Sequence, residues 1–147
     1  MTMLFVQENT TSRRRLETLV RRLSSEQLAR STASGWTVAA LLAHLAYWDQ
    51  RVLVLLRRCK EHGVDLSPVD ADAVNDAIKP LCLALDGQAA IQLCLSSAQA
   101  VDAELEALSA ELVETIQASS NHFRFNRALH RTDHLDEIEG LLQAIGY

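Results

Sequence analysis

The sequence predicts an all-α protein that folds as a four-helix bundle. The composition is 48% hydrophobic, with only 5 glycines and 2 prolines in 147 residues. Apolar residues recur at helical spacing in four long segments, which is typical of helices that bury one face. Few stretches are rich enough in β-branched residues to indicate strands. A chain of this length fits one domain, residues 1–147, around a single core.

The net charge and the cysteine content limit which functions this protein is expected to have. The net charge of −5 argues against a general nucleic-acid binder. Cys59, Cys82 and Cys94 have no metal-binding spacing, so we interpret them as reduced thiols within the core. No run of 18 apolar residues predicts a transmembrane helix. We therefore expect a cytoplasmic protein with neither a nucleic-acid nor a membrane partner.

The first long helix is expected to start within residues 9–12, because each of these residues offers a side chain suited to an N-cap. Its apolar face consists of Leu16, Leu19, Val20 and Leu23. We interpret its arginines as a solvated face or the rim of a dimer interface, with anion binding as an alternative. Ser24 and Gln27 then have the spacing of a capping box, which predicts a short helix over residues 25–30.

The second long helix is predicted to begin after Thr37, which has the character of an N-cap. Lys60, His62 and Gly63 indicate its end, because cations favour the C-terminus of a helix and glycine accepts the left-handed turn that follows. We interpret His62 as a terminal cation or surface residue. The apolar face is formed by Val38, Leu41, Leu42, Leu45, Trp48, Val52, Leu55 and Leu56.

A long connection follows the second long helix. Residues 64–69 are predicted to be a loop, and Asp70 is expected to cap a short helix that ends at Ala77. Pro80 is expected to interrupt this helix and leave residues 81–85 as a separate turn. The connection is long enough to cross the bundle, so simple up-down-up-down order is not required.

The second half of the chain contains two more long helices. Asp86 is expected to open the third, and Ser109 a short helix that ends near Gln117. One of residues 119–121 is expected to cap the last long helix, which runs to about Ala144. The apolar face of the third helix comprises Ile91, Cys94, Leu95, Ala98, Val101, Leu105 and Leu108.

Two histidines stand out in the last helix. By helical phase, His130 and His134 fall on an apolar stripe, where ionisable rings are rare. Their spacing places the Cβ atoms about 6 Å apart, so both rings can reach one metal ion. Ordinary polar side chains are the alternative interpretation. The rest of the stripe is Phe123, Ile138, Leu141 and Ile145.

His44 is the best candidate for a third ligand, because it lies at the flank of the apolar face of its own helix. A lone histidine there would more often be a core residue, but the pair in the last helix favours a ligand. Three histidines leave a coordination position open, as in catalytic sites. Zinc is the first candidate metal, and imidazole also suits nickel, copper and iron. By phase His122 points elsewhere, so we expect a surface or capping role.

Charged residues lie near this predicted site. Asp49 falls close to the apolar face of its helix, and Arg127 and Arg131 lie by phase near the two histidines. An ordinary salt bridge between helices is one interpretation. A support for the metal ligands, or a contact to a substrate carboxylate, is the other. Asp136 and Glu137 are expected to be solvated.

Two motifs resemble those of a known family. Residues 35–49 resemble the Trp-Thr/Ser-x-x-x-x-x-x-His-Leu signature of the DinB-like superfamily, with Trp36, Thr37 and His44 at the matching positions. Residues 130–134 resemble the His-x-x-x-His of its last helix. The superfamily includes the damage-inducible DinB proteins, relatives of bacillithiol transferases and the N-terminal domains of mycothiol-dependent maleylpyruvate isomerases. The resemblance extends over nearly the whole chain.

This resemblance implies an up-down-down-up bundle with short helices in the connections, and a homodimer. It also implies a divalent metal, zinc or nickel first, held by His44, His130 and His134. Known members act on low-molecular-weight thiols, which they transfer to electrophiles or use in isomerisation. The leading hypothesis is thus a metal-dependent thiol S-transferase or related detoxification enzyme, whose partners are a small thiol and an electrophile.

Two alternatives remain open from the sequence. One is a non-enzymatic metal-binding stress-response bundle that acts through dimerisation. The other is a metal-dependent hydrolase, which ranks last because no glutamate has a HExxH-type relation to the histidine pair.

Overall fold

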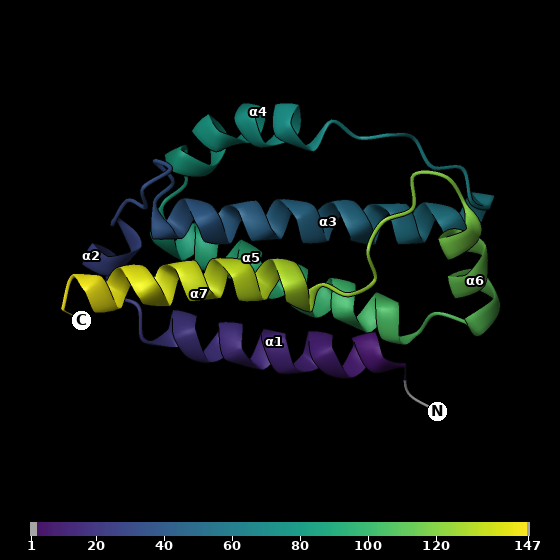
Figure 1. Cartoon of the computed structure of the whole chain (residues 1–147), viewed down its shortest axis with the longest axis horizontal. Coiled ribbons are helices and arrows are strands. Elements are labelled where there is room, and N and C mark those ends of the chain that lie inside the picture. The colour runs from purple at the N-terminus through teal and green to yellow at the C-terminus, as the bar shows by residue number, and fades with distance from the viewer. Residues whose placement is uncertain (1–2, 147) are drawn as a thin grey trace.

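The computed structural model describes residues 3–146, and these form seven α-helices with no β-strand. Four long helices lie side by side: α1 (Leu4–Arg21), α3 (Val38–His62), α5 (Gly87–Glu106) and α7 (Ala128–Ala144) (Figure 1). Shorter helices occupy the connections: α2 (Ser25–Leu28), α4 (Ala71–Ala84) and α6 (Ala110–Ala118). The predicted all-α helical bundle is confirmed.

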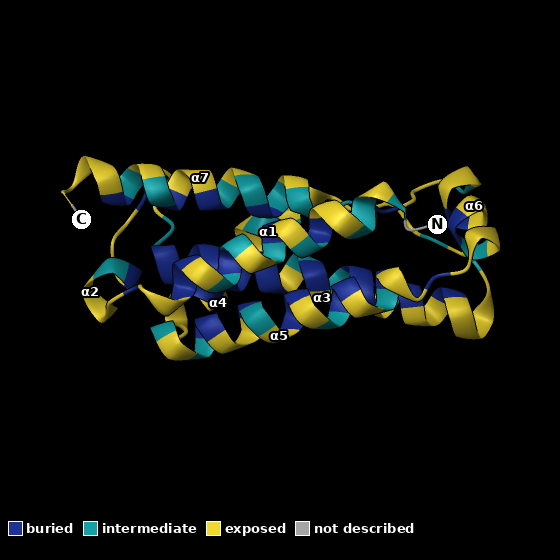
Figure 2. Ribbon diagram, turned by 90° about the horizontal axis from the view of Figure 1, so that it is seen from below, coloured by how far each residue is buried: buried dark blue, intermediate teal, exposed yellow. Residues whose placement is uncertain are grey.

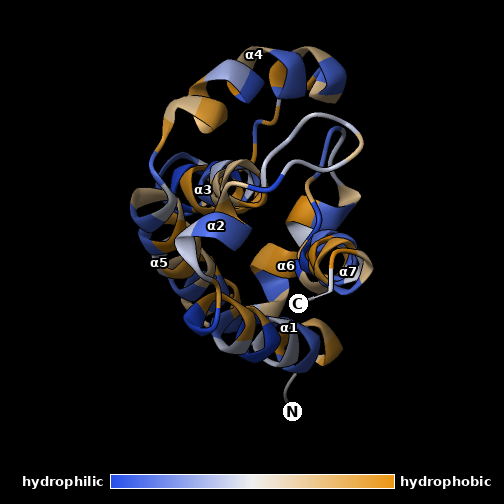
Figure 3. Cartoon of the chain, turned by 90° about the vertical axis from the view of Figure 1, so that its left-hand side faces the viewer, coloured by the Kyte–Doolittle hydropathy of each residue, from blue (hydrophilic) through white to orange (hydrophobic). Residues whose placement is uncertain are grey.

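The pair α3 and α5 forms the most extensive helix contact, and α7 packs against both α1 and α3. In Figure 1, α3 and α5 both run from the α2 end of the bundle toward the α6 end, whereas α1 and α7 run the opposite way. In chain order, α4 comes after α3 and before α5, and it returns the chain to the α2 end of the bundle. Figure 3 shows α4 on the outside of α3, on the side away from α1.

The apolar faces of the long helices bury each other in two clusters, and the buried positions in Figure 2 face inward. Along α3 the first cluster reaches Leu45 and the second begins at Val52. Asp49 is buried between them, in a polar layer that crosses the bundle. The three cysteines are free and buried, as predicted.

The helix α3 is the one helix within residues 3–146 that is long and apolar enough to cross a membrane by length and composition. Inside the bundle, 67% of the most apolar 18-residue stretch of α3 is buried. This is the pattern of a core helix in a soluble protein.

Local capping signals located several helix starts correctly. The side chains of Thr37, Asp86 and Ser109 each accept a hydrogen bond from the backbone N–H three residues on, at the starts of α3, α5 and α6. Ser24 and Gln27 form the predicted capping box, although α2 ends at Leu28 rather than at residue 30. Gly63 ends α3 with φ of 85°, a value that favours glycine.

The predicted start of the first helix is wrong, because α1 already begins at Leu4. The side chains that suggested N-caps at residues 9–12 serve other roles inside the helix. Thr10 and Ser12 donate hydrogen bonds to backbone carbonyls of the preceding turn. Asn9 is buried and bonds to the chain just before α7.

The predicted break at Pro80 is also wrong, because α4 continues from Ala71 to Ala84 with Pro80 inside it. A proline removes one helical hydrogen bond, to the carbonyl four residues earlier. Asp76, which holds that carbonyl, and Pro80 are both exposed on this outer helix, so water can replace the missing donor.

The last helix starts later than predicted. None of residues 119–121 caps it: α6 ends at Ala118, and Asn121 adopts a left-handed conformation with φ of 59°. The first N–H groups of α7 bond instead to Asn126, whose Oδ1 accepts from Ala128 N at 2.9 Å. Asn9 of α1 accepts from Arg127 N at 2.6 Å. This second cap comes from a distant part of the chain.

Candidate metal centre

His44, His130 and His134 meet where α3 packs against α7. One ligand atom from each ring lies within 4.8 Å of the other two, and the three ring centroids are 4.9 Å apart in each pair. His44 Nε2 and His130 Nε2 are 2.9 Å apart. Imidazole nitrogens bind zinc at about 2.0–2.1 Å, so small side-chain movements would close this triangle on one ion. The three residues could therefore hold a divalent metal.

The segment just before α3 positions the Trp36 ring beside His44. Gly35 has φ of 83°, and the turn that it makes leads directly to Trp36. The carbonyl oxygen of Trp36 accepts hydrogen bonds from Thr32 N and Oγ1, at 2.8 and 2.9 Å. The Trp36 ring then packs against the His44 ring, with centroids 5.2 Å apart.

The histidines lie at the edge of the buried face of α7, not at its centre. The buried residues of this helix are Arg131, Leu135, Ile138 and Leu142. Ile138 is buried as predicted, but the other buried positions each follow a predicted one by one residue: Arg131 follows His130, Leu135 follows His134 and Leu142 follows Leu141. Ile145 is exposed, and Phe123 is buried but precedes the helix. As a result the His134 side chain is 21% exposed, which gives the cluster contact with solvent.

Burial sets the protonation of two of the rings. Desolvation, with a smaller contribution from the neighbouring His134, lowers the pKa of His44 to about 4 and that of His130 to about 3. Both imidazoles are thus neutral at pH 7, which is the form that binds metals.

Glu137 is a partner that sequence reasoning missed. It was expected to be solvated, and it is exposed, but its Oε1 lies 3.0 Å from His134 Nδ1. With Nδ1 donating to this carboxylate, Nε2 of His134 keeps a free lone pair for a metal. The spacing of three residues on one helix is the signal that could have indicated this contact.

Asp49, Arg127 and Arg131 form the predicted salt bridges between helices. Asp49 on α3 bonds Arg127 Nε at 2.9 Å and Arg131 Nη2 at 3.2 Å. Only 7% of the Arg127 side chain and 1% of the Arg131 side chain are exposed. Both guanidinium groups are thus occupied by protein carboxylates.

Asp102 and Asn9 also belong to this network and were not identified from the sequence; Arg13 Nε on α1 pairs with Asp102 at 3.0 Å. Asp102 on α5 accepts two hydrogen bonds from Arg131, at 2.8 and 2.9 Å. An acidic residue next to Val101 on the apolar face of its helix is the signal that could have revealed it. Asn9 carries no such signal, because its partners are more than 100 residues away in sequence.

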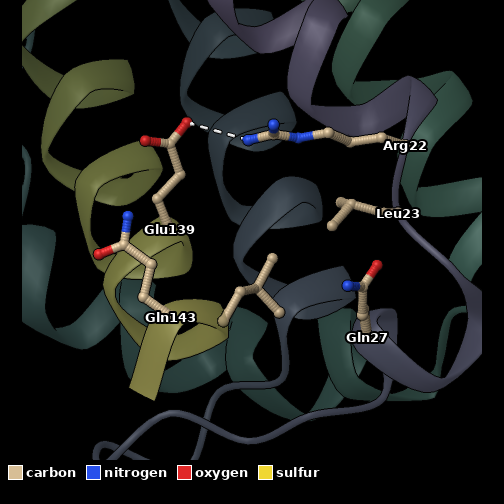
Figure 4. Close-up of a pocket in the computed structure, with 6 residues that line it drawn as sticks. Arg22, Leu23, Gln27, Glu139 and Gln143 are labelled. Carbon is tan, nitrogen blue, oxygen red and sulfur yellow. Dashed lines mark ion pairs between the residues drawn. The ribbon is translucent and has the colours of Figure 1, made fainter. Parts of the chain in front are cut away.

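The other histidines and a nearby pocket lie outside the cluster. His62 is exposed, and so is His122, whose Nδ1 lies 3.2 Å from the Ser119 carbonyl, in keeping with the predicted surface roles. A pocket of about 240 Å³ lies between the ends of α1 and α7, where Arg22 pairs with Glu139 at 3.6 Å (Figure 4). It is lined by no histidine, so it is separate from the candidate metal centre.

The metal-free protein should lose stability as the pH falls from about 6.5 toward 4. In this range unfolded histidines take up protons that His44 and His130 do not accept when folded, because burial lowers their pKa from 6.5 to about 4 and about 3. Protons thus favour the unfolded chain, and the free energy of unfolding decreases. Urea denaturation with a chelator, from pH 7.5 to 5, measures this slope.

The matched control for this slope is the His44→Asn, His130→Asn double variant. Its midpoint should depend less on pH over the same range. An equal slope in the two proteins would show that these rings do not remain neutral in the folded state.

Comparison with known proteins agrees with the motifs. The family model described as the DinB superfamily matches residues 8–137, which is most of the 147-residue chain. Comparisons with curated proteins and with solved structures gave no match. The matched range contains both signature motifs and all three clustered histidines. The chain therefore belongs to the DinB superfamily.

Proposed function

We propose that this protein holds a divalent metal, zinc or nickel first, at His44, His130 and His134, and that it transfers a low-molecular-weight thiol, through its sulfur atom, to an electrophile. The observation that carries the proposal is the convergence of three imidazoles, two of them held neutral by burial, at a point where His134 meets solvent. When bound, such a metal would lower the pKa of a thiol and keep it as a thiolate.

The residues of this chain supply orientation and access. Three protein ligands leave at least one coordination position for a small molecule. Glu137 fixes the orientation of the His134 ring, and the Asp49 salt bridges hold α7 against α3. In the transfer, the thiol gives its proton to solvent, sulfur forms a bond to the electrophilic carbon, and the leaving group departs with its electron pair.

The test is a transfer assay on the metal-loaded protein. Bacillithiol, mycothiol and glutathione are each incubated with a generic electrophile, and loss of the free thiol is followed. We expect at least one thiol to react faster than with the His130→Ala variant. If the native protein and the His130→Ala variant reacted at equal rates with every thiol, the proposed transferase activity would be contradicted. Tight metal binding with no thiol effect on the metal spectrum would instead favour the non-enzymatic metal-binding bundle.

We also propose that the protein acts in the cytoplasm as a homodimer. The free, buried cysteines fit a reducing compartment. The dimer is supported by the family resemblance and by apolar side chains left exposed on α3, on α4 and the residue after it, and on α5. These are Tyr47, Val54, Leu81, Leu85 and Leu93.

A further inference from the structure

Two pairs of an indole and a cation flank His44 along α3. On one side Lys79 Nζ lies 5.7 Å from the centre of the Trp36 ring, and that ring contacts His44. On the other side Trp48 follows His44 by one helical turn, so both project from the same face. The guanidinium carbon of Arg51 lies 5.9 Å from the Trp48 ring.

The helix α4 holds both indoles in place. Asn75 accepts a hydrogen bond from Trp48 Nε1 at 2.9 Å. One turn later, Lys79 donates to the Ser34 carbonyl at 2.8 Å and reaches over Trp36. This edge of α4 therefore lies beside the face of α3 that carries His44, and at the border of that face the His44 ring meets His130 and His134 of α7. Figure 3 shows α4 and α7 on different sides of α3.

Neither cation is neutralised by an acidic side chain. Within residues 3–146, Lys79 and Arg51 have no carboxylate within 4 Å, unlike the buried arginines Arg127 and Arg131. An indole face and a backbone carbonyl leave the positive charge intact. Both side chains are partly exposed, so each can still donate hydrogen bonds to an anion from solution.

We propose that Lys79, supported by Trp36, forms a binding subsite for a carboxylate, and that the thiol used by this protein carries such a group. The inference rests on the function proposed above and names the chemistry of its thiol. A sulfur atom at the histidine cluster would place the rest of the thiol along Trp36. Lys79 is within reach of its carboxylate, because the Trp36 indole lies against both the Lys79 ammonium group and His44.

The test compares two thiols that differ only in charge. Protein loaded with Co²⁺ is titrated with 3-mercaptopropionate and with its amide, and the thiolate-to-cobalt charge-transfer absorption reports binding. The native protein should bind the acid on the order of tenfold more tightly than the amide, as expected for a charge-assisted hydrogen bond. Lys79→Ala should abolish this preference, and Arg51→Ala, whose guanidinium lies on the other side of His44, should keep it.

Two matched variants control for charge and packing. Arg58→Ala removes one exposed cation from α3 two turns beyond Arg51, and it should keep the preference for the acid. Lys79→Arg should keep it as well. If Lys79→Ala only loosened α4, the affinities for the acid and the amide would fall together and the preference would persist, which would overturn the subsite.

The outcomes separate this inference from the function on which it rests. Equal binding of the acid and the amide to the native protein would overturn the subsite and leave thiol binding intact. A cobalt spectrum that neither thiol changes would contradict the thiol function itself, and the subsite with it.

Discussion

Replacement of His134 by alanine is expected to release most of the bound metal while the helices stay intact. Loss of a supporting contact to a metal ligand typically costs 10- to 100-fold in affinity, so loss of a ligand should cost at least about 100-fold. The fold should survive because His134 is partly exposed and belongs to neither apolar cluster. Leucines such as Leu135 carry the packing of α7.

Two measurements on the same sample check this result. Metal content after dialysis against a weak chelator should fall in His44→Ala, His130→Ala and His134→Ala, and far-UV circular dichroism should remain native. His122→Ala is the matched control, because that histidine is exposed in the loop before α7 and lies outside the cluster. If all three cluster variants keep their full metal, the metal is bound elsewhere.

The three clustered histidines were predictable because their signals are local. The spacing of His130 and His134 and the signature around His44 depend only on neighbouring residues. The phase of α7 was not predictable in the same way. Its first N–H groups bond to Asn126 and to the distant Asn9, and its buried face includes Arg131, whose partners lie on α1, α3 and α5.

The fold shows the same division between local and distant causes. Thr37 and Asp86 mark helix starts because the N-cap interaction lies within four residues. Asn9 has the same kind of side chain, yet tertiary contacts place it inside α1, where it supports α7. Pro80 stays helical because α4 lies on the surface, a position that no local pattern specifies.

The buried ion network offers the largest expected effect on stability. Arg131 joins three helices: it bonds Asp102 on α5, Asp49 on α3 and the carbonyl oxygen of Asn9 on α1. Burial lowers its pKa, but the bonds to these two carboxylates raise it more, so Arg131 stays charged. Because His130 is its neighbour in α7, the same contacts fix the histidine opposite His44.

Replacement of Arg131 by alanine should lower the free energy of unfolding by about 3–5 kcal/mol. The change removes two hydrogen bonds to Asp102 and one to Asp49, and it leaves the buried Asp102 with only the partly exposed Arg13 as an ionic partner, at 3.0 Å. Breaking a buried ion pair in this way is strongly destabilising. For a domain of this size the melting temperature should fall by roughly 10 °C or more. Differential scanning calorimetry and urea denaturation of the metal-free protein measure both quantities.

Arg15→Ala is the matched control, because Arg15 also joins α1 to α7 but pairs at the surface with Asp136 and Glu139. Exposed pairs contribute less than about 1 kcal/mol, so this variant should remain close to the native protein. Adding Asp102→Leu to Arg131→Met removes both charges, and this pair should recover much of the loss. Equal stability of Arg131→Ala and Arg15→Ala would show that the buried network does not hold α7 in place. The geometry of the histidine cluster would then depend on apolar packing alone.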